Sequence, residues 1–478
     1  MSFNKISRRV FTRGDLEWFA EQSGDWNPIH VDPVAARRSL TGDVVVHGML
    51  TLLWALECYC ANSGKVPKKI TVSFQRPISC GEAIDLFVEQ ISNTEDCLQI
   101  FNRKEVVTII RTEGSCLMPN QGIPASEVLP RTEPSYLRFA DIKDLSGVLE
   151  LQAVSGHVKS QFPKLVEVIG LLPVAAIMAS SRIVGMKCPG LLSLYSGAMF
   201  ELVPDDESTG LNWKVVRHTL AQAPVRLSIN GAGITGVLDA FVRPDPVLQP
   251  AISKIASQIE PGLCRGQVAW VIGGGRGLGE VVSKIVATGN GHVVLTYNQG
   301  EHDAVRVAEE ITSWGGSCEI FHMDVHDNTT VMRMIQSVRA PTHLYFFASR
   351  KIVHSRNDFF DQALFGEFIE TYVNSFARII MAVSEITSYP LKIFYPSTVF
   401  IDELPKEFPE YVSAKSAGEV LCNYLSSQLT NFDIVVKRLP RLRTDQTNTL
   451  IRIPTSDPVE HLVPIVRQMS MTVNHGDL

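Results

Sequence analysis

The chain of 478 residues lacks the features that mark disulfide-rich, metal-binding or nucleic-acid-binding proteins. Its cysteines number nine, an odd count, and include no CxxC pair, so we expect buried thiols in a reducing compartment, with neither a disulfide framework nor a metal site. The formal net charge is only −6, which gives no electrostatic reason to expect a nucleic acid or an anionic membrane as a partner.

Apolar runs of membrane-spanning length are also missing. The most apolar stretch, Val168 to Ser181, is too short to cross a bilayer and contains Pro173. The N-terminal MSFNKISRRVF is basic but is not followed by an apolar run of signal-peptide length, and the C-terminal NHGDL carries no peroxisomal or retention signal. We therefore expect a soluble cytoplasmic protein.

The composition that is present is typical of several folded domains. Hydrophobic residues make up 45% of the chain and charged residues 20%, and at about 150 residues per domain the length predicts about three domains. Two proline-rich connectors, residues 119–135 and 241–266, hold four prolines each. They divide the chain into three predicted segments, residues 1–118, 136–242 and 265–478.

The first two segments share an outline. In the first, Gly48 begins an apolar helical run and a strand-like run ends at Pro77, and in the second Gly170 and Pro204 take these places at nearly the same separation. This pattern predicts an α+β fold in which a helix lies across an antiparallel sheet, repeated once. The alternative is that any two α+β segments of this size align so loosely, and periodicity alone does not decide between the two.

The third segment alternates strands and helices. The run QVAWVIGG is typical of a buried strand, a glycine turn and an amphipathic helix follow it, and the strands HVVLTY, SCEIFHMDV and HLYFFAS then alternate with helices. This order with short connections predicts a Rossmann-type, doubly wound parallel sheet with helices on both faces.

The most specific local pattern is SGDWNPIH at residues 23–30. Pro28 fixes its own φ and moves Asn27 out of helical geometry, so the loop can direct the Asp25 carboxylate and the His30 imidazole at one point. A carboxylate and a neutral imidazole that reach one water are what adding water to a polarised double bond requires, and removing water uses the same groups in reverse. The alternative for an Asp and a His this close is a hydrogen-bonded turn without catalysis.

The first segment resembles the MaoC-like (R)-specific enoyl-thioester hydratases. Residues 24–36 match their signature, G-D-x-N-P-[LIV]-H-x5-[AS], at every defined position, and HGML and F-x-x-P follow where that family's hot-dog fold has its central helix and next strand. The resemblance implies that Asp25 and His30 are the catalytic pair and that Asn27 shapes the loop. Gly48, at the start of the apolar helix, can offer its N–H to a thioester oxygen, where the helix dipole favours a developing enolate.

The second segment carries no such string. It is expected to be the non-catalytic half of a double hot dog, retained because the long pantetheine arm of an acyl thioester lies between the halves. Ser181, Arg182 and the turn at residues 188–190 are candidates to line that channel, although ordinary core and turn positions are the simpler interpretation.

A glycine-rich run, GGGRGLG, lies between a predicted strand and helix of the third segment. In this context glycine lets backbone amides approach a pyrophosphate at the helix N-terminus. The candidate cofactor residues of this run are Gly273, Gly277, Leu278 and Gly279. The second strand runs to Asn298 without the acid that binds a free ribose 2′-OH, and Arg276 lies where a 2′-phosphate could be met, so both features favour NADP(H) over NAD.

A tyrosine and a lysine four residues apart, Tyr411 and Lys415, are predicted to share one helix face. The ammonium would lower the pKa of the phenol, so that Tyr411 can pass a proton to a carbonyl as hydride arrives. Ser397, at the end of a predicted strand, can hydrogen-bond that carbonyl. Y-x-x-x-K alone is common, and its alternative is an ordinary surface pair.

The order of the glycine-rich run, Asn374, the serine, the tyrosine and the lysine resembles the short-chain dehydrogenase/reductase family over essentially the whole third segment. The resemblance implies that Asn374 sustains a proton relay and that Lys415 also holds the nicotinamide ribose. It places further cofactor contacts at Asp324, Val325 and Thr444.

Three departures from that family's pattern are visible. Ile272 replaces the usual Thr before the glycine run, FFAS at residues 346–349 replaces N-N-A-G, and Pro440-Arg441 replaces Pro-Gly. None of them removes a chemical group needed for hydride transfer, so an active reductase is expected.

Together the two patterns suggest consecutive reactions on one tethered substrate. We expect a bifunctional 3-oxoacyl-thioester reductase and (R)-3-hydroxyacyl-thioester dehydratase for fatty-acid- or polyketide-type synthesis, acting on acyl carrier protein or CoA thioesters. The same residues in reverse would give an enoyl-CoA hydratase plus 3-hydroxyacyl-CoA dehydrogenase of β-oxidation. A cofactor-sensing or scaffolding protein with a degenerate reductase fold is the third possibility. The family resemblance also implies a homo-oligomer formed through the reductase segment.

Overall fold

The computed structural model describes residues 3–39, 41–115, 131–151, 155–204, 206, 208–220, 222–352, 360–387, 389–450 and 453–471. The chain forms two compact units, Met1–Asp245 with Thr449–Ile451 (unit 1) and Pro246–Asn448 with Arg452–Leu478 (unit 2). Most of the predicted connector at 119–135 lies outside the described residues. The division of unit 1 into segments 1–118 and 136–242 stays a prediction.

Unit 1 is built on one antiparallel sheet of ten strands in the order β1-β3-β4-β5-β2-β7-β10-β9-β8-β6. The strands of the first segment are β1 (Asn4–Val10), β2 (Lys69–Phe74), β3 (Ala83–Gln90), β4 (Glu95–Asn102) and β5 (Glu105–Glu113). Those of the second are β6 (Ser146–Glu150), β7 (Ser193–Leu202), β8 (Gly210–Arg217), β9 (Val225–Gly231) and β10 (Ile234–Val242). Pairing of β2 with β7 joins the two sets of five.

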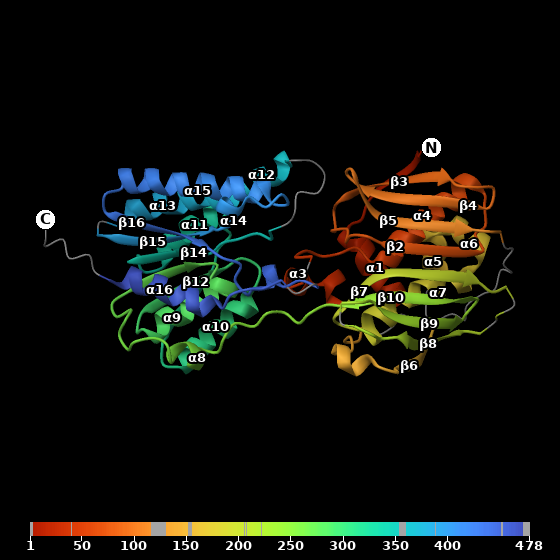
Figure 1. Cartoon of the computed structure of the whole chain (residues 1–478), viewed down its shortest axis with the longest axis horizontal. Coiled ribbons are helices and arrows are strands. Elements are labelled where there is room, and N and C mark those ends of the chain that lie inside the picture. The colour runs from red at the N-terminus through yellow and green to blue at the C-terminus, as the bar shows by residue number, and fades with distance from the viewer. Residues whose placement is uncertain are drawn as a thin grey trace. The chain divides into compact units, whose positions relative to one another are not determined.

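Two apolar helices, α4 (Gly48–Ser63) and α7 (Leu171–Arg182), lie against this sheet (Figure 1). Every side chain of α7 from Leu171 to Ser181 is buried, as expected of a helix that is apolar all round. The remaining helices are α1 (Arg13–Ser23), α2 (Pro28–Val31), α3 (Pro33–Arg37), η1 (Phe139–Ile142), α5 (Ser155–Gln161), α6 (Pro163–Ile169) and the π-helix η2 (Ile183–Lys187). The predicted class, a hot-dog region with an antiparallel sheet, is confirmed.

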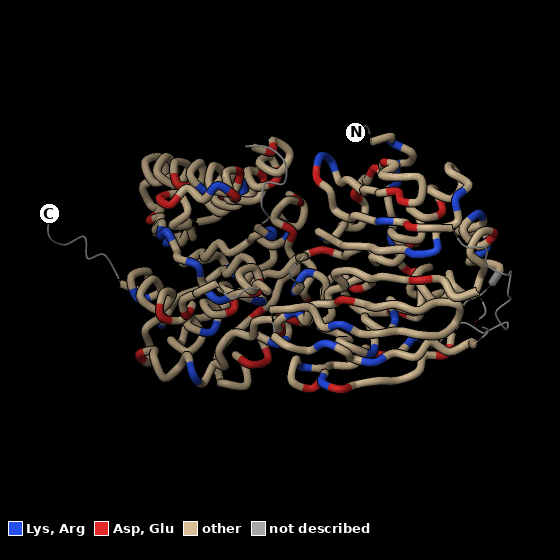
Figure 2. Tube along the Cα trace, turned by 45° about the vertical axis from the view of Figure 1, so that its right-hand side comes forward, with Lys and Arg blue, Asp and Glu red and all other residues tan. Residues whose placement is uncertain are grey.

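The described helices of this chain do not singly meet the criteria for crossing a membrane. Within the described ranges no single helix is long and apolar enough to cross a membrane, and only Pro163–Ile169 taken together with Leu171–Lys187, a pair bent by 112°, meets the length and hydropathy criteria. Figure 2 shows basic and acidic residues interspersed along the strands of unit 1.

Unit 2 is built on a parallel sheet of six strands in the order β13-β12-β11-β14-β15-β16. Its strands are β11 (Val268–Ile272), β12 (His292–Tyr297), β13 (Ser317–His322), β14 (His343–Phe346), β15 (Leu391–Thr398) and β16 (Phe432–Leu439). Its helices are α8 (Ile252–Ala256), α9 (Gly277–Thr288), α10 (Glu301–Ser313), α11 (Asn328–Ser337), α12 (Gln362–Ile369), η3 (Glu370–Asn374), α13 (Ser375–Ile386), α14 (Phe400–Glu403), α15 (Pro409–Gln428), η4 (Asp445–Thr447) and α16 (Pro458–Ser470).

The sheet of unit 2 is covered on both faces. Successive side chains of β11 point to opposite faces, so Ala269 and Val271 join one buried cluster while Trp270 and Ile272 join another. Figure 1 shows α13 and α15 on one side of the sheet and α8 to α10 on the other. This confirms the predicted Rossmann-type sheet. The strand order reverses at β11, and the crevice at the carboxyl ends of the strands there is where open α/β sheets bind ligands.

Candidate active sites

The loop between α1 and α2 brings Asp25 and His30 together. Helix α1 ends at Gly24, whose φ of 75° reverses the chain, and α2 begins at Pro28 after Asn27, which caps it by accepting from the Ile29 N–H. One oxygen or nitrogen from each of Asp25, His30 and a third residue, His47, lies within 4.8 Å of the others. The Asp and the His predicted from the sequence therefore share one place in unit 1.

The Asp25 carboxylate is enclosed by groups from the second segment. It is 1% exposed, and Oδ2 accepts a hydrogen bond of 2.6 Å from Ser181 Oγ at the end of α7. A Cβ on Gly185, in η2, would overlap Oδ1, so only glycine fits there. Burial raises the pKa of Asp25. Ser181, for which core packing was the simpler interpretation, is part of this site.

The His30 imidazole is held as one tautomer. Its Nδ1 lies 2.7 Å from the carbonyl oxygen of Val45. Because a carbonyl only accepts, Nδ1 carries the hydrogen and Nε2 keeps its lone pair. Burial lowers the pKa of His30, so the ring is neutral at pH 7. An acid with a raised pKa thus lies beside a base with a lowered one, which is the arrangement that acid–base catalysis uses.

Asn27 and Arg243 fix the loop that follows η2. Asn27 Nδ2 donates to the carbonyl of Gly185 at 2.9 Å and to that of Gly190 at 3.2 Å. Arg243, just after β10, donates from Nη2 to the carbonyl of Leu191 at 2.6 Å. Burial lowers the pKa of Arg243 to about 10. Its positive charge also contributes to the lowered pKa of His30.

His47 lies beside Asp25 and His30 and was not among the residues predicted for the site. Its ring stacks on that of His30 with centroids 3.9 Å apart and planes 24° apart, and its Nε2–H donates to the Asp25 carbonyl at 3.1 Å. Nitrogen lone pairs lie in the ring plane, so two stacked imidazoles do not direct them at one metal ion. The geometry fits a role in orienting His30. The sequence feature that could have identified His47 is its position directly before Gly48 in HGML.

Gly48 is the first residue of α4 and has no room for a side chain. A Cβ there would lie 2.8 Å from the ring of Phe74. The first-turn N–H groups of a helix have no acceptor within it, and His47 provides no side-chain cap. The N–H of Gly48 at the positive end of α4 is thus a possible donor to a bound oxygen, and the role predicted for Gly48 stays a prediction.

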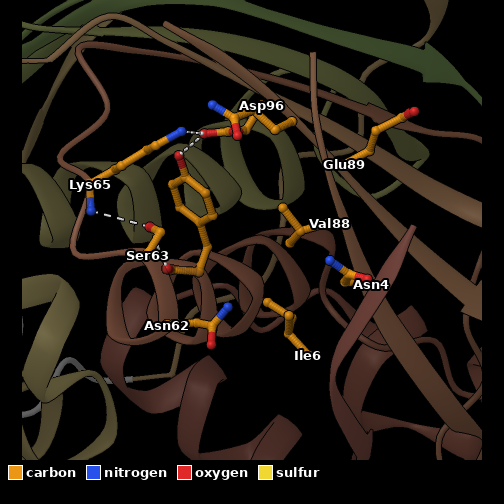
Figure 3. Close-up of a pocket in the computed structure, with 10 residues that line it drawn as sticks. Asn4, Ile6, Asn62, Ser63, Lys65, Val88, Glu89 and Asp96 are labelled. Carbon is orange, nitrogen blue, oxygen red and sulfur yellow. Dashed lines mark hydrogen bonds and ion pairs between the residues drawn. The ribbon is translucent and has the colours of Figure 1, made fainter. Parts of the chain in front are cut away.

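A pocket lies at the C-terminal end of α4, away from Gly48, and none of the predicted site residues lines it (Figure 3). It has a volume of about 420 Å³ and is lined by Tyr59, Lys65 and Asp96 among others. Asp96 accepts from Tyr59 Oη at 2.5 Å and from Lys65 Nζ at 2.6 Å. Because these groups satisfy one another, the arrangement is that of a structural cluster.

In unit 2 the glycine-rich run forms the turn between β11 and α9. Gly273 and Gly277 have φ of 79° and 59°, and a Cβ on Gly279 would overlap the carbonyl oxygen of Gly273. Leu278 lies in the first turn of α9, whose N-cap, Arg276, provides no side-chain cap. The Gly273 and Gly274 N–H groups donate to Thr296 at 3.0 Å each. The first-turn amides of α9 have no acceptor within the helix, and they fit the pyrophosphate of a dinucleotide.

Arg276 already has a carboxylate partner. Its Nη2 lies 2.7 Å from Asp445 Oδ2, and Asp445 also accepts from the Val247 N–H at 2.7 Å. The guanidinium is therefore not reserved for a 2′-phosphate. Asn298 is exposed directly after β12, and Thr444 precedes η4, where its N–H donates to Thr447 Oγ1 at 3.0 Å.

Asp324 and Val325 follow β13. The Asp324 carboxylate accepts from the His326 N–H at 2.9 Å and lies 3.1 Å from His326 Nδ1. The Val325 carbonyl accepts from Arg378 Nη1 at 2.7 Å. Both residues are engaged within unit 2, and the cofactor contacts expected of them stay predictions.

Tyr411 and Lys415 are buried together on α15, at 7% and 5% exposure, so they are not a surface pair. Lys415 Nζ donates to the Pro396 carbonyl at 2.8 Å, and burial lowers the pKa of Lys415 to about 7. Burial also raises the pKa of Tyr411. Desolvation of the phenol is the largest cause of this rise, and the lowering expected from Lys415 stays a prediction.

Ser397 is bonded to a glutamate of α15. Its Oγ donates to Glu419 Oε1 at 2.5 Å, whereas the Thr398 side chain is among the groups that lower the pKa of Tyr411. Successive side chains of a strand point to opposite faces, so a shift of one residue along β15 changes which hydroxyl reaches the site. Thr398 is thus a second candidate for the hydroxyl that binds the carbonyl, and the role of Ser397 stays a prediction.

Asn374 lies outside the cluster around Tyr411. It is exposed, and its Nδ2 donates to Glu370 Oε2 at 2.6 Å. The side chain that η3 directs inward is Tyr372, which is 1% exposed and has its ring centroid 5.7 Å from that of Tyr411. Residues two apart on a helix point in nearly opposite directions, so both cannot face the site. The relay predicted for Asn374 is not supported.

Family models match both parts of the chain. Residues 1–111 match the MaoC like domain, and residues 267–440 match the short chain dehydrogenase model. The mitochondrial 3-hydroxyacyl-[acyl-carrier-protein] dehydratase of Arabidopsis thaliana is 30% identical over 121 residues, which are 23% of this chain and 73% of that protein.

Two further curated proteins are similar. The fatty acyl-CoA reductase of Acinetobacter baylyi is 25% identical over 210 residues, covering 41% of this chain and 70% of that protein. The 3-hydroxybutyryl-CoA dehydratase of Methylorubrum extorquens is 28% identical over 92 residues, covering 19% of this chain and 59% of that protein.

Proposed function

We propose that this chain reduces a 3-oxoacyl thioester and then removes water from the resulting (R)-3-hydroxyacyl thioester. It belongs to the MaoC like dehydratases through residues 1–111 and to the short chain dehydrogenases through residues 267–440. The observation that carries the dehydratase half is the contact of His30 Nδ1 with the Val45 carbonyl, which leaves Nε2 as a base beside Asp25.

In this proposal the two groups act as base and acid in dehydration. Nε2 of His30 takes the proton from carbon 2 of the thioester, and Asp25, in its protonated form, gives its proton to the hydroxyl that leaves carbon 3 as water. The N–H of Gly48 stabilises the charge that develops on the thioester oxygen. Hydration is the same sequence in reverse.

Reduction uses the cluster on α15. A nicotinamide cofactor, when bound, supplies the hydride, and the turn from Gly273 to Gly279 with the N-terminus of α9 would hold its pyrophosphate. Tyr411 gives a proton to the carbonyl oxygen, Thr398 hydrogen-bonds that oxygen, and Lys415 stabilises the phenolate.

The ion pair between Arg276 and Asp445 bears on the cofactor and on the direction of reaction. NADPH remains our proposal, because Asn298 stands directly after β12 in place of the acid that binds a ribose 2′-OH and Arg276 is the cation of the glycine turn. If Asp445 stays paired with Arg276 when the cofactor binds, we expect the cofactor to be NAD. The chain would then catalyse the reverse sequence, hydration followed by dehydrogenation in β-oxidation. We propose synthesis of the fatty-acid or polyketide type in the cytoplasm. The substrate would be a thioester of acyl carrier protein or of CoA, because the similar proteins are named for one or the other.

We also propose a homo-oligomer formed through unit 2. The helices α13 and α15 expose large apolar side chains, with Met381 61%, Val420 54% and Tyr424 67% exposed. Such side chains on neighbouring surfaces are typical of an interface.

The test is product analysis of the full-length protein with NADPH and an acetoacetyl or longer 3-oxoacyl thioester. We expect the enoyl thioester from the wild type, the 3-hydroxyacyl thioester to accumulate with His30→Ala, and neither product with Tyr411→Phe. Cofactor binding without turnover of any 3-oxoacyl thioester, with cellular function intact in Asp25→Ala, would instead favour a sensing or scaffolding role.

A further inference from the structure

Lys415 is a buried cation without a paired carboxylate. Its side chain is 5% exposed, and among the described residues no carboxylate oxygen lies within the 4.0 Å of an ion pair. The acidic residue nearest in sequence, Glu419, is occupied by Ser397 at 2.5 Å and by Arg438, whose Nη2 lies at 2.6 Å. A buried ammonium needs some compensation for the hydration that it loses.

Two aromatic rings take the place of a counter-ion. Lys415 Nζ lies 4.0 Å from the ring centroid of Tyr372 and 5.0 Å from that of Tyr395, both within the range of a cation–π interaction. The rings come from η3 and from β15, so they reach the ammonium from different elements. Pro396 accepts one hydrogen bond from the same Nζ at 2.8 Å.

The two rings are themselves fixed in place. Tyr395 Oη donates to the backbone carbonyl of Tyr372 at 3.0 Å, and Tyr372 Oη lies 3.0 Å from Ser349 Oγ. A Cβ on Gly418, three residues after Lys415 on α15, would overlap the Tyr395 hydroxyl, so glycine provides the room that this ring needs.

We propose that Tyr372 and Tyr395 form an aromatic cage that keeps Lys415 protonated and holds its Nζ on the Pro396 carbonyl. Tyr372 is thereby a positioning residue of the reductase site and occupies the inward place predicted for Asn374. The inference rests on the proposed reductase function and extends it, since it names what sets the charge of the lysine.

The cage predicts the sign of a pH effect. The titratable groups that act on or face Lys415 are Glu419, Cys422 and Tyr411 on α15 together with the two cage tyrosines. The π face of a cage ring favours the charged ammonium, so removing one of the two rings should lower the pKa of Lys415. The activity of the reductase should then begin to fall at a lower pH on the alkaline side of its profile. A desolvated cation–π contact corresponds to a shift of roughly one pH unit.

The test compares Tyr372→Leu, which removes the π face, with Tyr372→Phe, which keeps it. In the full-length protein without cofactor, the ¹³Cε resonance of Lys415, assigned by its loss in Lys415→Met, is titrated by NMR. The pH profile of 3-oxoacyl-thioester reduction is then measured. We expect the Lys415 titration midpoint and the alkaline limb of the activity profile to move to lower pH by roughly one unit in Tyr372→Leu. In Tyr372→Phe both should move by less than about 0.3 unit. Tyr389→Leu, at a surface tyrosine of unit 2, serves as the control.

The outcomes separate this inference from the proposed function. A Lys415 titration that is unchanged in Tyr372→Leu, or that moves equally in Tyr372→Phe, overturns the cage. If the titration moves as expected but the wild type reduces no 3-oxoacyl thioester, the cage stands and the reductase function falls. Should Tyr372→Leu fail to fold, as judged by circular dichroism, Tyr372→Met replaces it as a variant of similar volume without a π face.

Discussion

At the scale of single residues, Asp25 and His30 have pKa values shifted in opposite directions by the same cause. Burial raises the pKa of Asp25 and lowers that of His30, so both move toward neutrality. The hydrogen bond from Ser181 opposes the shift of Asp25, because it favours the carboxylate.

Ser181→Ala should therefore raise the pKa of Asp25 further. Dehydration needs the protonated carboxyl, so its loss at alkaline pH should begin at higher pH, by roughly half a unit to one unit. The measurement is the pH dependence of kcat/KM for dehydration. Ser180→Ala, which removes the neighbouring buried hydroxyl, is the matched control and should leave the profile unchanged. An equal shift in both variants would show that the contact with Asp25 is not the cause.

Thr398→Val should slow reduction while Ser397→Ala should not. Removing the hydroxyl that acts on Tyr411 deprives the reacting carbonyl of a hydrogen bond, which we expect to lower kcat by about 10- to 100-fold. Ser397 donates to Glu419 instead, so its removal should change kcat by less than about threefold. Rates with NADPH under saturating thioester decide the matter, and the reverse ranking would restore the original prediction for Ser397.

At the scale of elements, the π-helix η2 links the second segment to the Asp25 carboxylate. It continues α7 by Ile183–Lys187 and places Gly185 where a Cβ would overlap Asp25 Oδ1. Gly185→Ala should therefore displace the carboxylate and lower dehydration by more than about 100-fold. Gly156→Ala, in α5, is the control, because a Cβ there meets nothing within 4 Å.

Reduction of the 3-oxoacyl thioester by the same Gly185→Ala protein shows whether the effect stays within unit 1. We expect it to equal the wild-type rate. Loss of both activities together would point to a folding defect rather than to displacement of Asp25.

How far the sequence predicts these elements depends on how local their causes are. The loop of Asp25 and His30 is predictable because Gly24, Asn27 and Pro28 shape it within a few residues. The contacts of Ser181 and Gly185 are not, since they bring together residues about 160 positions apart. The expectations for Asn374 and Ser397 depend on phase, because a shift of one or two residues along a helix or strand reverses the direction of a side chain.

At the scale of the whole molecule, unit 1 uses both of its halves for one site. The pairing of β2 with β7 makes one sheet of ten strands, and the acid–base pair of the first segment is completed by side chains of the second. A fragment of residues 1–245 should therefore dehydrate a 3-hydroxyacyl thioester at close to the full-length rate. A fragment of residues 1–118 should lack this activity, and full activity of the shorter fragment would show that the second segment is dispensable.

The central claim is that one chain carries out reduction and dehydration in sequence. It is tested most directly by mass analysis of the products formed from a 3-oxoacyl thioester and NADPH. We predict that the enoyl thioester forms, that one NADPH is consumed per molecule reduced, and that His30→Ala stops the sequence at the 3-hydroxyacyl thioester. Binding of the cofactor with no reduced product from any 3-oxoacyl thioester would contradict it.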